Sequence, residues 1–270
     1  MAIITISRGS YSKGKTIAER VAEKLGYECV SRDILLEASE HFHIPEIKLV
    51  RALHDAPSIL ERFSFGKERY VAFIEEAFLE HMQKDNVVYH GLAGHFFLKG
   101  VGHNLKVRIV ADIEDRVKLE MEREGITEAK ARNILKKDDY ERRRWAMALY
   151  GIDTTDPRLY DLCIHIHKIA VEDAVDIICH AAKLPHFTTT DDSQKRMDDL
   201  VLASKVKVAV IDEWPKAQVT AHEGAVYIHT DAPLEQEALI QDKIGKVAEA
   251  VAGVKKVSVS VTPRGAGSKA

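Results

Sequence analysis

The first part of the chain alternates between short apolar runs and longer stretches that place apolar residues at helical spacing. The short runs are rich in β-branched residues, which is typical of buried strands in a parallel sheet. We expect strands at residues 3–6, 27–30, 86–91, 105–111 and within 159–166. We expect helices between them, at residues 17–25, 34–38, 68–82, 120–150 and 171–183. This order predicts an α/β fold, with a five-stranded parallel sheet covered by helices on both faces.

The pattern changes after residue 185, where a polar stretch predicts a linker. Apolar and polar residues then alternate over residues 218–230 about Glu223-Gly224, which indicates a hairpin. Helices are expected at 197–211 and 233–252, and a last strand at 254–261. The predicted organisation is a first domain at 1–185, a linker at 186–195, a small α+β domain at 196–263 and a flexible tail at 264–270.

A glycine-rich motif lies between the first predicted strand and the first predicted helix. Residues 9–16 match G-x-x-x-x-G-K-T, and Gly26 follows the helix where a capping glycine is expected. A strand before the motif and a helix after it are the context in which this pattern forms a phosphate-binding loop, or P-loop. The alternative is a strand-to-helix turn that contains glycine and Lys-Thr by chance.

The residue types in this loop suit a bound triphosphate. Gly9 and Gly14 let the backbone approach an anion closely, and the loop amides and the helix N-terminus direct positive partial charge at it. Lys15 can reach the β- and γ-phosphates, and the Thr16 hydroxyl can bind Mg²⁺. The residues predicted to bind ATP are Gly9, Ser10, Tyr11, Ser12, Lys13, Gly14, Lys15 and Thr16.

Three further residues are candidates for ligand contacts, each with a structural alternative. Asp33 follows the second strand, where open α/β sheets bind ligands, but it is equally suited to cap the next helix. Arg51 could bind the phosphate of an acceptor nucleotide or could be a surface charge. Arg116 could stack on an adenine, or it could pair with Asp112 or Glu120 on its own helix.

Residues 136–145 form a highly charged stretch that contains three consecutive arginines. Charge runs are most often solvated helix faces. Phosphoryl transfer, however, needs cations that close over the γ-phosphate, and an arginine-rich helical hairpin is a suitable lid. The residues alone leave both interpretations open.

Composition narrows the classes of partner. The chain has 46% hydrophobic and 30% charged residues and a net charge of −3, so it offers no general attraction for nucleic acid or for an anionic membrane. No apolar run approaches the length of a membrane span. Cys29, Cys163 and Cys179 are scattered along the chain, and the sequence shows no export signal. We therefore expect them to be reduced thiols in the core of a cytoplasmic protein. The histidine pairs at 41–43 and 165–167 have no cysteine or carboxylate set near them at metal-ligand spacing.

The first domain resembles the cytidylate kinase-like family of P-loop nucleoside monophosphate kinases. The resemblance covers residues 1 to about 185 in order, which is more specific than any single motif. In the N-terminal part it rests on residues 4–8, on the loop to Thr16, on the helix that follows as far as Tyr27, and on residues 31–33. Further along the chain it rests on residues 108–111 together with Arg116, on residues 137–142 and on residues 160–162. It implies transfer of the ATP γ-phosphate to a nucleoside monophosphate with Mg²⁺, and CMP is the first candidate acceptor.

The resemblance also implies residue roles. Lys15 would stabilise the transferred phosphoryl group. Arg142 and Arg144 would act from the lid, with Asp139 orienting them. Asp33 and Arg51 would lie on the acceptor side.

The chain departs from the family pattern in two places. Its loop ends in Gly-Lys-Thr where members often have Gly-Arg-Thr, which strengthens triphosphate binding. Residues 41–65 do not match cytidylate kinases closely, so the base of the acceptor is left open.

The C-terminal part resembles a BON domain, on residues 224–228 and 251–257. Such modules are linked with binding lipids or small ligands. The resemblance implies an unidentified small ligand or protein partner and a role in regulation or assembly. The oligomeric state is left open.

Three functions are compatible with these features. The leading hypothesis is a nucleoside monophosphate kinase. A second is a P-loop kinase that acts on another small metabolite. A third, from a different class, is a nucleotide sensor in which ATP binding alters what the C-terminal domain holds.

Overall fold

A five-stranded parallel sheet organises the first part of the protein. The computed structural model describes residues 2–9, 12–31, 65–91, 94–233 and 236–263. The strands are β1 (Ile3–Arg8), β2 (Glu28–Ser31), β3 (Val87–His90), β4 (Asn104–Ala111) and β5 (Leu162–Ile166). Their order is β2-β3-β1-β4-β5, and every pairing is parallel. The predicted sheet is therefore confirmed.

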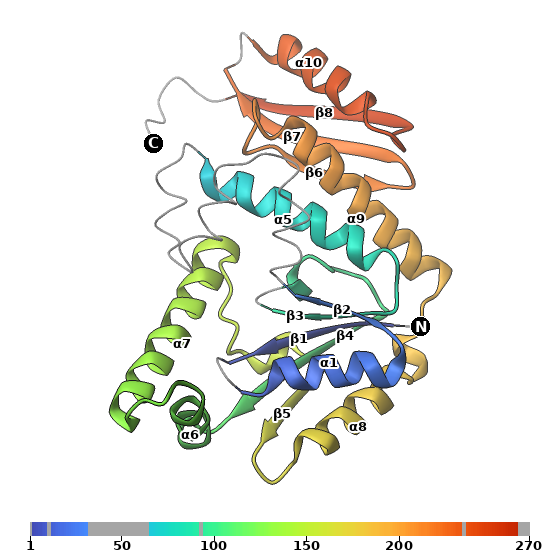
Figure 1. The fold of residues 1–270 in the computed structure, drawn as a ribbon. Coiled ribbons are helices and arrows are strands. Elements are labelled where there is room, and N and C mark those ends of the chain that lie inside the picture. The colour runs from blue at the N-terminus through green and yellow to red at the C-terminus, as the bar shows by residue number, and fades with distance from the viewer. Residues whose placement is uncertain (1, 10–11, 32–64, 92–93, 234–235, 264–270) are drawn as a thin grey trace.

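Helices cover both faces of this sheet (Figure 1). Helices α1 (Gly14–Leu25) and α8 (Val171–Ala182) pack on one face, over side chains such as Ile6 and Ile109. Helix α5 (Gly66–Met82) packs on the other face, over Ile3. Successive side chains of a strand point to opposite faces, so each inner strand contributes to both cores. Short 3-10 helices are η2 (Gly94–Phe96), η3 (Pro157–Leu159) and η4 (Pro185–Phe187).

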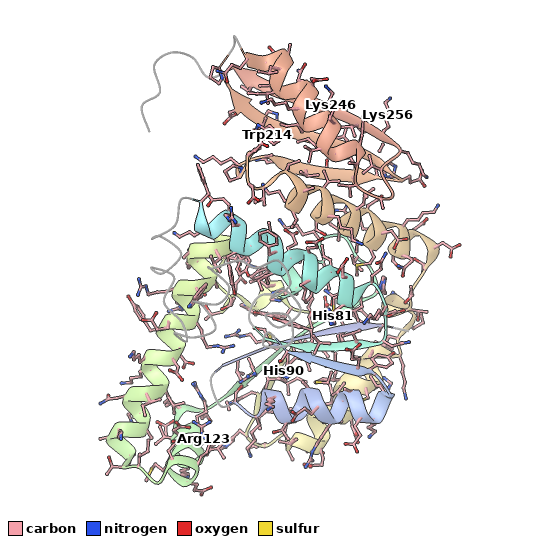
Figure 2. The ribbon with its side chains drawn as sticks, turned by 45° about the horizontal axis from the view of Figure 1, so that its top comes forward. His81, His90, Arg123, Trp214, Lys246 and Lys256 are labelled. Atoms are coloured by element: carbon pink, nitrogen blue, oxygen red, sulfur yellow. The ribbon has the colours of Figure 1, made fainter. Side chains whose placement is uncertain are left out.

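Strand β1 occupies the centre of the sheet, between β3 and β4. The chain that leaves β1 passes through α1 to β2 on one side, whereas β4 and β5 lie on the other side. The carboxyl end of β1 is therefore the point where the strand order reverses, and open α/β sheets bind ligands in the crevice at that point. His90, the last residue of β3, lies at the same carboxyl edge (Figure 2).

The charged stretch predicted at residues 120–150 forms two helices, α6 (Ile113–Glu124) and α7 (Glu128–Tyr150). Gly125 ends α6 with φ of 62°, a left-handed conformation that favours glycine. Val117, Ala131 and Leu135 form a small core between the two helices. This helical hairpin lies beyond one end of the sheet, apart from α1 and α8 (Figure 1).

The C-terminal part is a second layer built on a three-stranded sheet in the order β6-β7-β8. Its elements are α9 (Asp191–Val210), β6 (Gln218–His222), β7 (Ala225–Ala232), α10 (Glu237–Glu249) and β8 (Lys256–Pro263). The predicted hairpin is present, because β6 and β7 are antiparallel and both Glu223 and Gly224 have positive φ. Trp214, Lys246 and Lys256 lie in this layer, away from the edge that carries His90 (Figure 2).

Helix α9 begins earlier than expected, inside the stretch predicted as a linker. Thr190 and Ser193 cap its first turn, since each backbone amide donates to the other residue's hydroxyl, at 2.9 and 3.2 Å. Met197 lies in the core under α5, and Val206 lies in the core of the C-terminal sheet. One helix therefore belongs to both cores, and the predicted domain boundaries stay a prediction.

All three cysteines are free thiols. Cys179 is buried and Cys29 is half-buried, but Cys163 is exposed. The prediction of a core position is wrong for Cys163, because β5 is an edge strand whose alternate side chains face solvent. In the part of the chain that the structure describes, no helix is both long and apolar enough to cross a bilayer.

Trp145 anchors the base of α7, and its removal should destabilise the fold. It is 2% exposed and packs on Tyr70 of α5, with 5.8 Å between ring centroids. We expect Trp145→Ala to lower the free energy of unfolding by about 3–5 kcal/mol, because truncation of a buried aromatic leaves a cavity. Met147→Ala, at an exposed position of the same helix, is the control and should cost less than about 1 kcal/mol. Chemical denaturation measures both, and equal losses would contradict the anchoring role.

Candidate functional site

The turn from β1 into α1 is packed tightly. A Cβ atom added at Gly14 would lie 2.7 Å from the Cβ of Arg8, so only glycine fits there. The Ser12 hydroxyl donates to the Gly9 carbonyl at 3.1 Å and lies 3.4 Å from the Ile109 carbonyl. These contacts hold the described part of the loop against the ends of β1 and β4.

Helix α1 starts directly from this loop. Lys13 precedes it with φ of 61°, and Gly14 is its first residue. Lys15 and Thr16 lie exposed on the first turn, and the Lys15 Nζ is 3.7 Å from a carboxylate oxygen of Glu19. The helix N-terminus, with its free amides, therefore lies beside an exposed cationic side chain.

Ser10 and Tyr11 lie outside the described residues, so their predicted contacts stay predictions. The same holds for Asp33 and Arg51, the two residues expected on the acceptor side. The structure consequently describes the donor side of the predicted site and its lid, but not the acceptor residues named from the sequence.

A cavity of about 420 Å³ lies between the P-loop and the helical hairpin. Of the described residues, six basic ones and one acidic one, Asp139, line it. The basic residues are Arg8, Arg108, Arg116, Lys136, Arg142 and Arg143. They come from strands β1 and β4 and from helices α6 and α7, which are distant in sequence but meet at the carboxyl edge of the sheet. The cavity is suited to anionic ligands such as phosphates.

Arg116 is held at the loop by Asp139. It is 8% exposed, and its guanidinium lies 2.9 Å from the Asp139 carboxylate on α7. A Cβ at Gly9 would be 3.8 Å from the Arg116 guanidinium, so this side chain borders the P-loop backbone. The sequence suggested a base contact or a partner on the same helix for Arg116. The structure gives it a carboxylate partner on the second helix of the hairpin, and the predicted base contact stays a prediction.

The three consecutive arginines of α7 point in different directions. Arg142 donates to the backbone carbonyl of Arg8 at 3.3 Å, so it reaches the start of the P-loop. Arg143 also lines the cavity, and its guanidinium lies 3.5 Å from the Thr155 hydroxyl.

Arg144 turns away along its own helix. Its guanidinium is 3.6 Å from Glu141 and 5.7 Å from the Tyr140 ring centroid, and it does not line the cavity. The sequence predicted roles for Arg142 and Arg144 but not for Arg143, because a run of arginines does not show which of its members faces a ligand.

A second group of polar side chains borders the cavity from the sheet. The guanidinium of Arg108 lies 3.4 Å from both the Ser7 and the Tyr160 hydroxyl, and 5.5 Å from the Tyr160 ring centroid. Tyr160 donates to the Thr154 carbonyl at 2.9 Å. Its ring packs against buried His95, whose pKa is lowered to about 4, first by burial and then by the nearby cations Lys106 and Arg108.

The histidines at 165 and 167 approach carboxylates that the sequence did not place near them. His165 lies 3.2 Å from Asp112, and His167 lies 3.2 Å from Asp115. Asp112, Asp115 and His167 form an exposed group with the spacing of metal ligands. The carboxylates come from the start of α6, so sequence spacing could not reveal the group.

The largest cavity described, of about 600 Å³, lies away from the P-loop, between α9 and the turns of the C-terminal sheet. It is lined by both signs of charge, with Lys195, Lys205 and Lys255 near Asp198, Asp199 and Glu223. This balance does not select a class of ligand. The small ligand or partner expected for a BON-like module stays a prediction.

Comparison with known proteins supports the interpretation of the first part of the chain. Residues 3–168 match the model of the cytidylate kinase-like family. A cytidylate kinase of Staphylothermus marinus is 30% identical over 182 residues, which cover 66% of this chain and 94% of that protein. A cytidylate kinase of Archaeoglobus fulgidus is 29% identical over 184 residues, covering 67% and 94%.

A solved structure shares the fold. An uncharacterized protein from Eubacterium ventriosum superposes with a TM-score of 0.53 and 24% sequence identity, covering 67% of this chain and 98% of that chain. The P-loop turn, the basic cavity and the family match over 3–168 point to one conclusion. The chain belongs to the cytidylate kinase-like family of P-loop kinases.

Proposed function

We propose that this kinase transfers the γ-phosphate of ATP to a nucleoside monophosphate. The observation that carries the proposal is the cavity between the P-loop and the helical hairpin, where six basic residues face one acidic residue. Phosphoryl transfer brings two highly anionic groups together, and that approach needs such an excess of positive charge.

The donor side fits a triphosphate. Gly14 lets the backbone approach closely, the N-terminus of α1 supplies amides, and Lys15 lies exposed on the first turn, where it would contact the phosphates. Thr16, on the first turn of α1, would hold Mg²⁺, which neutralises charge on the transferring phosphate. The match of these residues to the P-loop pattern supports ATP as the donor.

The chemistry needs no covalent enzyme intermediate. An oxygen of the acceptor phosphate attacks the γ-phosphorus, the bond to the bridging oxygen of ATP breaks, and ADP leaves. Lys15 and Arg142 would stabilise the charge on the transferring group, and Asp139 would keep Arg116 beside Gly9. Catalysis then consists of positioning and electrostatic stabilisation.

CMP is the first acceptor to test, because the relatives of this chain from two archaea are named as cytidylate kinases. Asp33 and Arg51 remain the proposed acceptor residues. The C-terminal layer is proposed to bind a separate ligand or partner, which would regulate the kinase through α9.

The proposed function is tested by ADP release from Mg-ATP in a coupled assay. The acceptors are CMP, dCMP, UMP, AMP and GMP, with a reaction that lacks acceptor as the blank. We expect one acceptor, CMP or dCMP, to raise the rate far above the blank. ATP binding with no response to any acceptor would rule out the monophosphate kinase and favour the sensor or a different metabolite.

Lys15 should be required for turnover. We expect Lys15→Met to lower kcat by about 10²- to 10³-fold, because a cation aimed at the transferring phosphate is lost. Lys24→Met, on the exposed end of the same helix, is the matched control and should retain activity. The coupled assay with the best acceptor measures both variants. Comparable activity in the two variants would contradict the role of Lys15.

Arg142 and Arg144 should differ, because only Arg142 lines the cavity. We expect Arg142→Ala to lower kcat by about 100-fold while ATP binding changes little, since its contribution arises in the transition state. Arg144→Ala should stay within about 10-fold of the parent enzyme. Steady-state kinetics and ATP titration measure both effects. Equal losses would support the sequence-based prediction that Arg144 also acts from the lid.

A further inference from the structure

We propose that Arg108 forms an anion subsite that binds the phosphate of the acceptor, on the lid side of the sheet. The inference rests on the proposed function and names a residue that holds its second substrate. The observation is a half-buried guanidinium that lines the basic cavity and contacts only neutral groups.

The charge of Arg108 has no carboxylate in ion-pair contact among the described residues. Its contacts are the hydroxyls of Ser7 and Tyr160 and the face of the Tyr160 ring. Both hydroxyl contacts are long, at 3.4 Å, and both use the same guanidinium nitrogen. The remaining N–H groups of the planar fork can therefore donate to a ligand.

Two other arginines of the cavity have a carboxylate partner. Arg116 is neutralised by Asp139 at 2.9 Å, and Arg143 lies 3.6 Å from Asp153. A partly buried cation is favoured only when an anion or several acceptors compensate its desolvation. The charge of Arg108 is thus suited to an incoming anion, and its fork matches a phosphate.

Arg108 lies on the face of the sheet opposite the one that α1 covers. Its neighbours on β4, Val107 and Ile109, point into the core beneath α1. Strand side chains alternate, so Arg108 and its register partner Ser7 face the opposite side of the sheet, toward the lid. The N-terminus of α1 receives the donor phosphates, whereas Arg108 faces a group that enters under the hairpin.

The surroundings keep Arg108 in place. Its guanidinium stacks on Tyr160, whose own hydroxyl donates to the Thr154 carbonyl. Buried His95 also packs on that ring and stays neutral at physiological pH, so it adds no repulsive charge. An arginine with little freedom loses little entropy when a phosphate binds.

The test measures anion binding with the donor site filled. The full chain is saturated with Mg²⁺ and a non-hydrolysable ATP analogue, and inorganic phosphate, CMP and cytidine are titrated calorimetrically. We expect Arg108→Gln to weaken binding of phosphate and of CMP by about 10- to 100-fold, with no change for cytidine. Arg108→Lys should recover part of the affinity, because it keeps the charge but loses the fork.

The control is Arg158→Gln, which removes an arginine whose side chain is 88% exposed and does not line the cavity. It should bind phosphate and CMP like the parent protein, and thermal melting of every variant verifies folding. Unchanged phosphate binding in Arg108→Gln, or no phosphate binding by the parent protein, would overturn the subsite. Phosphate binding that depends on Arg108, together with no turnover of any monophosphate, would leave the subsite standing and overturn the proposed function.

Discussion

The tight turn between β1 and α1 is the constraint on which the rest of the site depends. Gly14 packs against the side chain of Arg8 so closely that no Cβ fits between them. This contact sets where α1 begins and aims its amides over the end of the central strand. Strand β1 is paired on both sides, by β3 and β4, so the loop follows a strand that is held firmly in the centre of the sheet. A phosphate-binding backbone needs that rigidity, because its donors must be in place before the ligand arrives.

The second feature is an imbalance of charge. The sheet edge and the helical hairpin bring six basic residues around one cavity, and Asp139 is the acidic residue described there. Like charges held close in a partly desolvated space repel one another, and anionic ligands remove that repulsion. The pair between Arg116 and Asp139 joins the two helices of the hairpin beside Gly9. The same cluster of charge therefore also fixes α6 against α7.

The C-terminal layer is joined to the kinase fold through a shared helix. Met197, Val201 and Val208 on one face of α9 pack in the core under α5, and Val206 and Val210 on another face pack on the three-stranded sheet. Any ligand that shifts the C-terminal sheet would act on α9, and through it on the core that contains Trp145 of α7. A continuous packed helix is the kind of element that can carry such coupling.

The sequence alone determined the sheet, the P-loop and the hairpin turn at Glu223-Gly224, because strand patterning, a glycine-lysine motif between a strand and a helix, and turn chemistry are local properties. It did not determine that α9 starts at Asp191 and belongs to two cores. The direction of each lid arginine and the approach of Arg108 to Ser7 and Tyr160 were likewise open. Those features depend on contacts between residues far apart in the chain, such as Arg116 with Asp139 and Ser7 with Arg108. Only the packing of the tertiary structure decides them, since a local pattern shows which residues are charged but not which charges meet.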